Sequence, residues 1–194
     1  MGYKMTFLLF DTETSGLYNY DLPSNHKDQP YLLQIAYQVI TDDPWVIQKE
    51  TNKIIYYENI CIPEETQNVH GINPEICKNK GIDPKIVLQE LIDDVNNFNV
   101  NMLVAHNIRF DYEVLKSALI RNEMSLDSIK DTELFCTSDG FKNVTKLLMG
   151  NGKYKRPSLQ ELHYHLFHDT FDDGHDAMQD VRITSKCLKK ILER

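Results

Sequence analysis

Residues 7–17 read Phe-Leu-Leu-Phe-Asp-Thr-Glu-Thr-Ser-Gly-Leu. The four apolar residues at the start are typical of a short strand that is buried on both faces of a sheet. Two carboxylates, Asp11 and Glu13, come directly after them, and a Ser-Gly turn follows. Residues two apart on a strand share a face, so both carboxylates can reach one point where the strand ends. Because adjacent buried carboxylates are costly without a cation, the pair favours a site for Mg²⁺ or Mn²⁺.

The bulk composition predicts one domain that spans residues 1–194. Hydrophobic residues make up 41% of the chain and charged residues 26%, which is ordinary for a soluble globular protein. The four cysteines are far apart and form no CxxC pair, so reduced thiols and a cytoplasmic location are expected. With no signal-peptide pattern and no long apolar run, we expect no contact with a membrane. The net charge of −8 disfavours a broad basic surface for nucleic acid, but not an enzyme that handles nucleotides through metal ions.

The hydrophobic pattern predicts an α/β fold, in which a mixed sheet (an antiparallel meander plus parallel strands) is flanked by helices. Apolar runs typical of strands occupy residues 7–10, 31–40, 45–49, 53–60, 101–107 and 130–136. Helical spacing or helix-start residues mark residues 84–98, 110–124, 142–149, 158–167 and 175–192, after two helical turns between residues 63 and 79 that Gly71 interrupts. A polar loop, residues 18–30, connects the first two strands, either as part of the path to the site or as a harmless insertion.

Further acidic residues follow at the ends of other predicted elements. One motif comes after the strand that ends near residue 105 and reads His106-Asn107-x-x-Phe110-Asp111. The other opens the C-terminal helix and reads His175-x-x-x-x-Asp180. Each acid alone is also explained by a simpler role, because carboxylates are favoured in the first turn of a helix and in solvated turns. The order and context of all three motifs therefore carry the argument.

The three ordered motifs closely resemble those of the DEDDh (DnaQ-like) 3′-5′ exonucleases, the family of the proofreading exonuclease subunit of bacterial replicative polymerases. The resemblance covers residues 7–192 and implies an RNase H-like sheet. It implies two divalent metal ions, Mg²⁺ or Mn²⁺, held by Asp11, Glu13, Asp111 and Asp180, with His175 as the general base. The expected substrate is the 3′ end of a nucleic acid (single-stranded DNA favoured over RNA), and the expected product is a nucleoside 5′-monophosphate. A polymerase or a second copy of the chain remains open as a partner.

The same resemblance implies a set of substrate-binding residues near the acids: Thr12, Thr14, Leu17, His70, Asn107 and Phe110. Core packing is the alternative role for Leu17 and Phe110. Five basic residues in the later part of the chain either contact upstream phosphates or form a solvated face: Lys142, Lys146, Lys153, Lys155 and Arg156.

Three other functions are weighed against this one. A catalytically silent module that binds nucleic acid or docks a partner is disfavoured because every expected catalytic position holds a competent residue. An aspartyl phosphatase would use Asp11 as its nucleophile, but Glu13 and the later His and Asp fit that chemistry poorly. Zinc binding would use three neighbouring histidines, which helical spacing does not put on one face: His163, His165 and His168.

Overall fold

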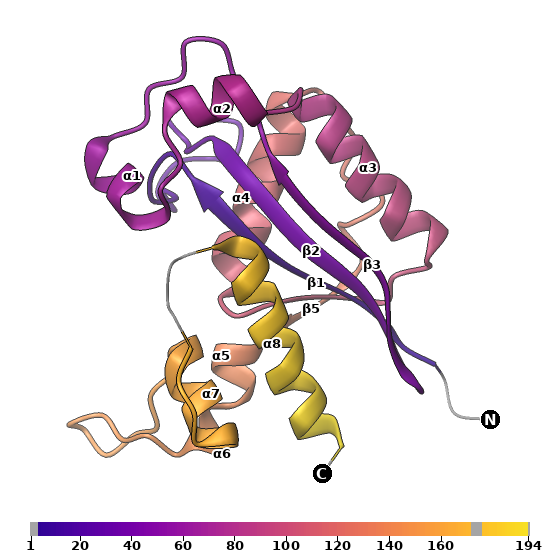
Figure 1. Ribbon diagram of the computed structural model, residues 1–194, viewed down its shortest axis with the longest axis vertical. Helices are drawn as coiled ribbons and strands as arrows, with labels where there is room; N and C mark the ends of the chain where they lie inside the picture. Colours follow the sequence, from indigo (N-terminus) through magenta and orange to yellow (C-terminus); the bar gives the residue numbers. More distant parts are fainter. Residues whose placement is uncertain (1–3, 172–175, 194) are drawn as a thin grey trace.

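In the computed structural model, residues 4–171 and 176–193 are described. They build a five-stranded sheet with the strand order β3-β2-β1-β4-β5 (Figure 1). The first three strands pair antiparallel, whereas β1 with β4 and β4 with β5 pair parallel, which confirms the predicted mixed sheet. The strands are β1 (Thr6–Thr14), β2 (Leu32–Asp42), β3 (Trp45–Ile54), β4 (Met102–Ala105) and β5 (Glu133–Cys136).

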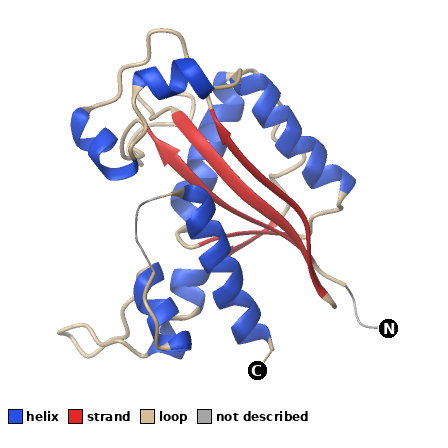
Figure 2. Cartoon of the chain, in the orientation of Figure 1, coloured by secondary structure: helices blue, strands red, loops and turns tan. Residues whose placement is uncertain are grey.

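Helices cover both faces of this sheet (Figure 2). They are α1 (Glu64–His70), α2 (Pro74–Lys80), α3 (Pro84–Asn97), α4 (Ile108–Arg121), α5 (Thr137–Gly140), α6 (Lys142–Thr145), α7 (Leu159–Phe167) and α8 (Ala177–Leu192). Asp83, Ser158 and Asp176 cap α3, α7 and α8 through side-chain hydrogen bonds to backbone N–H groups, as helix-start residues should. None of these helices, which belong to the described part of the chain, has the length and apolarity needed to cross a lipid bilayer.

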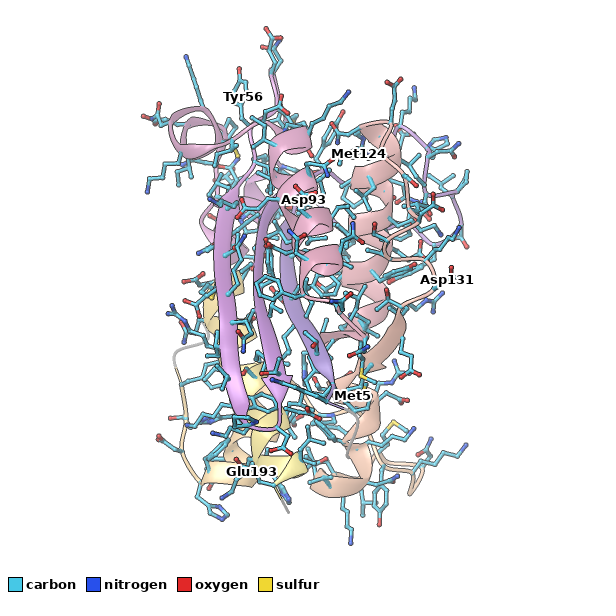
Figure 3. The ribbon with its side chains drawn as sticks, turned by 90° about the vertical axis from the view of Figure 1, so that its right-hand side faces the viewer. Met5, Tyr56, Asp93, Met124, Asp131 and Glu193 are labelled. Atoms are coloured by element: carbon cyan, nitrogen blue, oxygen red, sulfur yellow. The ribbon has the colours of Figure 1, made fainter. Side chains whose placement is uncertain are left out.

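The buried strand β1 lies at the centre of the sheet and supplies both halves of the core. Leu8 and Phe10 point to the side covered by α3 and α4, whereas Phe7 and Leu9 point to the side covered by α7 and α8. Figure 3 shows α3, near the labelled Asp93, and α4 on the same side of the strands. Because successive side chains alternate between the faces of a strand, four consecutive apolar residues stabilise both layers, each by about 1.5–3 kcal/mol.

The second half of the meander differs from its prediction. Residues 45–49 and 53–60 were expected as two strands, but β3 is continuous from Trp45 to Ile54, and Ile55 then forms a parallel bridge with Ile82. The misleading residues are the polar run at positions 50–53. Glu50 and Asn52 are exposed on this edge strand, Lys53 is half-buried and Thr51 is buried, so a stretch that reads as a turn is a half-solvated strand.

The region before α7 also differs from its prediction. A helix was expected over residues 142–149, but α6 is a single turn that stops where Lys146 adopts a left-handed conformation with φ of 51°. The chain then forms a small antiparallel hairpin, in which Leu148 pairs with Tyr154. The apolar residues at 147–149 led to the prediction of a helix. The glycines at 150 and 152 favour instead the turn of the hairpin.

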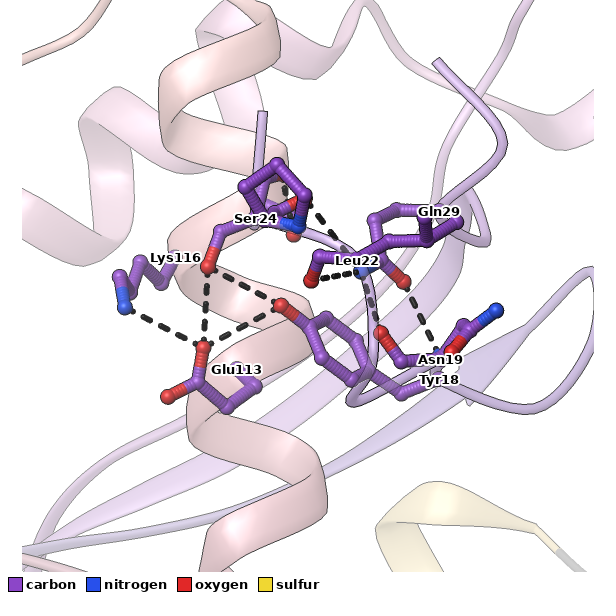
Figure 4. Close-up of polar contacts among 9 residues, drawn as sticks. Tyr18, Asn19, Leu22, Ser24, Gln29, Glu113 and Lys116 are labelled. Carbon is purple, nitrogen blue, oxygen red and sulfur yellow. Dashed lines mark hydrogen bonds and ion pairs between the residues drawn. The ribbon is translucent and has the colours of Figure 1, made fainter. Parts of the chain in front are cut away.

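The predicted loop at residues 18–30 is fastened to the outer side of α4 (Figure 4). The hydroxyls of Tyr18 and Ser24 both donate to Glu113 Oε2, at 3.3 and 3.1 Å. At the far end of the loop the Arg121 guanidinium donates to the carbonyl oxygens of Gln29 and Pro30. These side-chain bonds hold the loop in one arrangement, so its length does not leave it loose.

Candidate active site

Two parallel strands bring the first acidic residues together. Asp11 and Glu13 lie on the C-terminal half of β1, and β4, which is parallel to β1, ends at Ala105 and leads into α4. Parallel strands end at the same edge of a sheet, so the first turn of α4, with Asp111, lies beside the β1 carboxylates. The structure thus places Asp11, Glu13 and Asp111 together at one end of the parallel strands.

Asp111 is fixed by the residue between the two β1 carboxylates. Its Oδ1 accepts hydrogen bonds from the backbone N–H of Thr12 at 3.1 Å and from the Thr12 hydroxyl at 2.8 Å. Both residues are buried, with 3% and 5% of their surfaces exposed. Two donors on one carboxylate oxygen hold the side chain in place and leave its other oxygen available.

The fourth acid arrives from the opposite end of the chain. Asp180 lies in the first turn of α8 and, with the three other acids, lines a cleft of about 380 Å³. The remaining residues of the cleft wall are Thr12, Leu17, His106, Asn107, Phe110 and Leu159. No lysine or arginine of the described chain contributes to this wall. The four acidic residues named from the sequence thus converge on one cleft.

The acids in this cleft suppress the ionisation of one another. Burial, reinforced by Asp111 and Asp180, raises the pKa of Asp11 well above its usual range. Burial and the charges of Asp180 and Asp111 raise the pKa of Glu13 to about 8. Burial raises the pKa of Asp111 to about 7, although the bonds from Thr12 act in the opposite direction. A cluster of carboxylates that resists ionisation is the environment that divalent cations neutralise.

The donor set fits hard divalent ions, since it consists of carboxylate oxygens. Among the residues that the structure describes, no three acidic, histidine or cysteine side chains are grouped tightly enough to form a metal site as they stand. Repulsion between the carboxylates favours such a spread arrangement. We therefore expect small side-chain rotations when ions bind.

A second cleft, of about 400 Å³, adjoins the acidic one. The two share Thr12, Glu13, Leu17 and Phe110. Leu17 is 90% exposed, which excludes core packing, whereas Phe110 both packs against the core and lines the two clefts. The further wall residues are Thr14, Gly16, Glu65, Thr66, Val69 and His70. An apolar cleft with a few polar groups beside a cluster of carboxylates has the surface that a base and its sugar require.

His70 is oriented by the strand that carries the acids. Its Nδ1 accepts the backbone N–H of Ile72 at 3.0 Å, so its Nε2 carries the proton and donates to the carbonyl oxygen of Thr14 at 3.1 Å. Asn107 precedes α4 at the N-cap position, but its side chain makes no capping bond and lines the acidic cleft. Five of the six residues expected to bind substrate thus lie in the second cleft or on the wall it shares, and Asn107 lies in the first.

The sequence matches a known family along most of its length. The family model described as Exonuclease, of the RNase T type, matches residues 8–188. The chain belongs to this exonuclease family. No curated protein matches the sequence.

Solved structures with the same fold include exonucleases. Escherichia coli exonuclease I in complex with a dT13 oligonucleotide superimposes with a TM-score of 0.75 at 21% identity. The zinc-bound form of the E. coli exonuclease I–ssDNA complex gives 0.73 at 20%, and exonuclease I from Methylocaldum szegediense gives 0.74 at 19%. In each case the match covers 98% of this chain and 41% of the other, so the chain spans about two fifths of the length of these enzymes.

Within this exonuclease fold, several site residues were not predicted from the sequence. Glu65, Thr66 and Val69 belong to α1, a helix with no buried residue, and they form the far wall of the second cleft. His106 connects the end of β4 to the chain before α7, because it hydrogen-bonds the Thr137 hydroxyl at 2.9 Å and the Pro157 carbonyl oxygen at 3.0 Å. Burial lowers the pKa of His106, which keeps the ring neutral in this role. Because α1 has no periodic apolar face, nothing in its local sequence marked it as a wall of the site.

The predicted general base, His175, lies outside the described residues. Of the three histidines considered for zinc, His163 is 2% exposed, and its two ring nitrogens face the Asp169 carbonyl oxygen and the Lys186 ammonium. These contacts and the neighbouring ring of Phe167 fit a packing role. The phosphatase alternative needs a lysine counter-charge beside Asp11, and the described wall of the cleft has none.

Proposed function

We propose that this chain is a DEDDh-type 3′-5′ exonuclease that depends on divalent metal ions and acts as one domain. The observation that carries the proposal is the convergence of four carboxylates on one cleft, next to a cleft of nucleotide size; the pKa values of Asp11, Glu13 and Asp111 are raised there. Membership of the exonuclease family supports the reaction class.

The four carboxylates, Asp11, Glu13, Asp111 and Asp180, would hold two ions, Mg²⁺ or Mn²⁺. When bound, such ions supply charge neutralisation and water activation to a phosphodiester, which otherwise resists attack by water. The bonds from Thr12 hold Asp111 in place, and the strand geometry directs Asp11 and Glu13 to the same side. His175 takes the proton of the attacking water, a task for which the usual imidazole pKa of about 6.5 is suited.

The second cleft would receive the terminal nucleotide. Leu17, Val69 and Phe110 offer apolar surface to the base, while the His70 ring and the backbone near Thr14 bound the polar side. We propose single-stranded DNA as the preferred substrate, with RNA as the second choice and nucleoside 5′-monophosphates as products. The E. coli and M. szegediense enzymes share the fold, and the former is solved with DNA oligonucleotides.

The test uses matched single strands of DNA and RNA that carry a 5′ label. With Mg²⁺ or Mn²⁺ we expect a ladder that shortens from the 3′ end, and with EDTA no cleavage. Asp11→Ala and His175→Ala should each abolish cleavage without altering the circular dichroism spectrum. The matched control is Asp93→Ala, an exposed aspartate on α3, which should leave the ladder unchanged (Figure 3).

Three outcomes discriminate between the functions. Wild-type turnover in Asp11→Ala would refute the assignment of the metal ligands, and turnover in His175→Ala would refute the assignment of the base. No cleavage by the folded wild-type protein in the presence of metal, together with strand binding, would favour the silent binding module.

A further inference from the structure

The hairpin after α6 has a charge unlike that of the whole chain. Residues 146–156, here called the basic arm, read Lys-Leu-Leu-Met-Gly-Asn-Gly-Lys-Tyr-Lys-Arg and contain no acid, in a chain of net charge −8. The arm projects from the body of the molecule beside α5, α6 and α7 (Figure 1). A basic segment that leaves an acidic body is the electrostatic feature expected where a polyanion is held.

The basic arm has a defined structure. The backbone N–H of Met149 donates to the carbonyl oxygen of Lys153, and that of Lys155 donates to the carbonyl oxygen of Leu147, both at 2.8 Å. Gly152, at φ of +77°, makes the turn between the two sides. The backbone of the arm is therefore held in one arrangement, which lowers the entropy lost when the arm binds a ligand.

Several side chains of the basic arm are available to a ligand. Lys146, Lys153 and Arg156 are exposed, and neither of the two lysines forms an ion pair with a described residue. Tyr154 is 42% exposed and Leu148 66% exposed. An exposed aromatic ring among cations is the combination that proteins use to hold single-stranded nucleic acid, by stacking on bases and pairing with phosphates.

Two acids near the base of the arm do not cancel this charge. Lys155 pairs with Glu161 at 2.6 Å, and Arg156 pairs with Asp139 at 3.1 Å. Asp139 also forms an ion pair with Lys142, so one carboxylate is shared between two cations. Exposed pairs of this kind contribute little, about 0–1 kcal/mol, so a phosphate can displace the carboxylates.

The base of the arm is continuous with the catalytic cleft. A groove of about 410 Å³ is lined by Lys155, Arg156 and Glu161 on the arm side of the chain, and also by His106 and Asn107, which line the acidic cleft as well. The bond from His106 to the Pro157 carbonyl oxygen ties the base of the arm to the end of β4. A strand whose 3′ end lies among the carboxylates can therefore continue into this groove and along the arm.

We propose that the basic arm and this groove bind the phosphates of a single-stranded polynucleotide upstream of the bond that is cut. This inference rests on the proposed exonuclease function for the direction of the strand. It gives the arm a role in affinity for long strands, separate from the cleavage of the terminal nucleotide. Lys146 and Lys153 line neither the acidic cleft nor this groove, so the turnover of a trinucleotide bound in the cleft should not depend on these two lysines.

The decisive variant is Lys146→Gln/Lys153→Gln, which removes two exposed charges and keeps the backbone bonds. Lys78→Gln/Lys80→Gln is the matched control, because α2 lies at the opposite end of the molecule and both lysines are exposed (Figure 1). Binding of fluorescent DNA and RNA strands of about 15 nucleotides is followed by anisotropy in EDTA over a range of KCl concentrations. Turnover of a trinucleotide is measured in parallel with Mg²⁺.

For the arm variant we expect Kd for the long strand to rise about tenfold at low salt, and the slope of log Kd against log[KCl] to fall by about 1.4. The control variant should match the wild type in both, and all proteins should cleave the trinucleotide at the same rate within about twofold. A second variant, Tyr154→Ala, should weaken long-strand binding about tenfold without changing the salt slope, because stacking involves no counterion release.

Unchanged affinity and slope in the arm variant would overturn the proposal, and so would preference for duplex over single strands. The two hypotheses fail separately. If the protein cleaves strands but the arm variant binds long strands as tightly as the wild type, the exonuclease function stands and the proposed role of the arm is refuted. If binding of long strands depends on the arm but the protein cleaves no strand, the arm is a binding surface and the exonuclease function is refuted.

Discussion

Replacing Glu13 by Gln should stabilise the metal-free protein, by an amount that grows as the pH rises. Burial and the neighbouring charges of Asp180 and Asp111 raise the pKa of Glu13 from 4.5 to about 8 in the folded state. The folded state therefore binds this proton more tightly than the unfolded chain does. The free energy of unfolding that this proton contributes is fully present below about pH 4.5 and is lost as the pH rises through about 8.

The size of the effect follows from the pKa difference. A pKa difference of about 3.5 units can destabilise the folded state by at most about 5 kcal/mol. The destabilisation is about 3 kcal/mol at pH 7 and about 1 kcal/mol at pH 5. Glu13 retains some solvent contact, which screens its charge, so we expect about half of each value. The Gln side chain has nearly the same shape but no charge, so Glu13→Gln should recover this free energy.

The assay is urea unfolding in EDTA between about pH 5 and about pH 8, followed by circular dichroism. Glu58→Gln is the control, because it makes the same chemical change at an exposed turn position outside both clefts. Mg²⁺ should reduce or reverse the advantage of the variant, because ions that bind the folded wild type stabilise it. A difference that stays constant with pH, or a Glu13→Gln protein that is less stable than wild type at high pH in EDTA, would refute the reasoning.

Three further predictions follow from single contacts. Thr12→Val removes the hydroxyl that holds Asp111 at 2.8 Å, and should lower kcat about fivefold with little change in KM, as measured on labelled strands. Gly81→Ala should destabilise the fold by about 2–3 kcal/mol in urea unfolding, because the new Cβ would lie 2.2 Å from a backbone carbonyl oxygen of α2; a neutral result would show that the backbone can move aside. Tyr37→Phe removes a buried 2.6 Å hydrogen bond to Asp94 and should lower stability by about 1–3 kcal/mol without affecting cleavage, whereas a loss of cleavage at full stability would contradict a structural role.

The residues of the acidic site could be named from the sequence because each lies in a short motif of neighbouring residues. A four-residue apolar run identifies a strand buried on both faces, and β1 occupies the centre of the sheet with its side chains divided between two layers. The acids follow at element ends, and the elements alternate as parallel strands and helices require. The strand and the alternation of its side chains follow from periodicity, whereas the grouping of the four acids was predicted from the resemblance of the three ordered motifs to those of the exonuclease family.

Other features could not be predicted because they depend on contacts between distant segments. The continuous β3 was obscured by polar residues, whose placement on an edge strand is settled by pairing with β2. The wall formed by α1 has no periodic apolar face of its own, so nothing local marks it as part of a site. The hairpin after α6 replaced a predicted helix because Lys146 takes a left-handed conformation, where helix propensity no longer applies.

By itself, the sequence determined the mixed α/β sheet, the order of its main elements and the four acids that meet at its edge. Only the tertiary structure decided how strongly those acids suppress the ionisation of one another, since burial and distance are properties of the folded chain. It also decided that the five basic residues are not equivalent. Lys142, Lys155 and Arg156 all pair with carboxylates, and of these three Lys155 and Arg156 also line the groove that adjoins the acidic cleft. The charge of a residue is known from the sequence, but the direction of its side chain and the groups around it depend on how the chain packs.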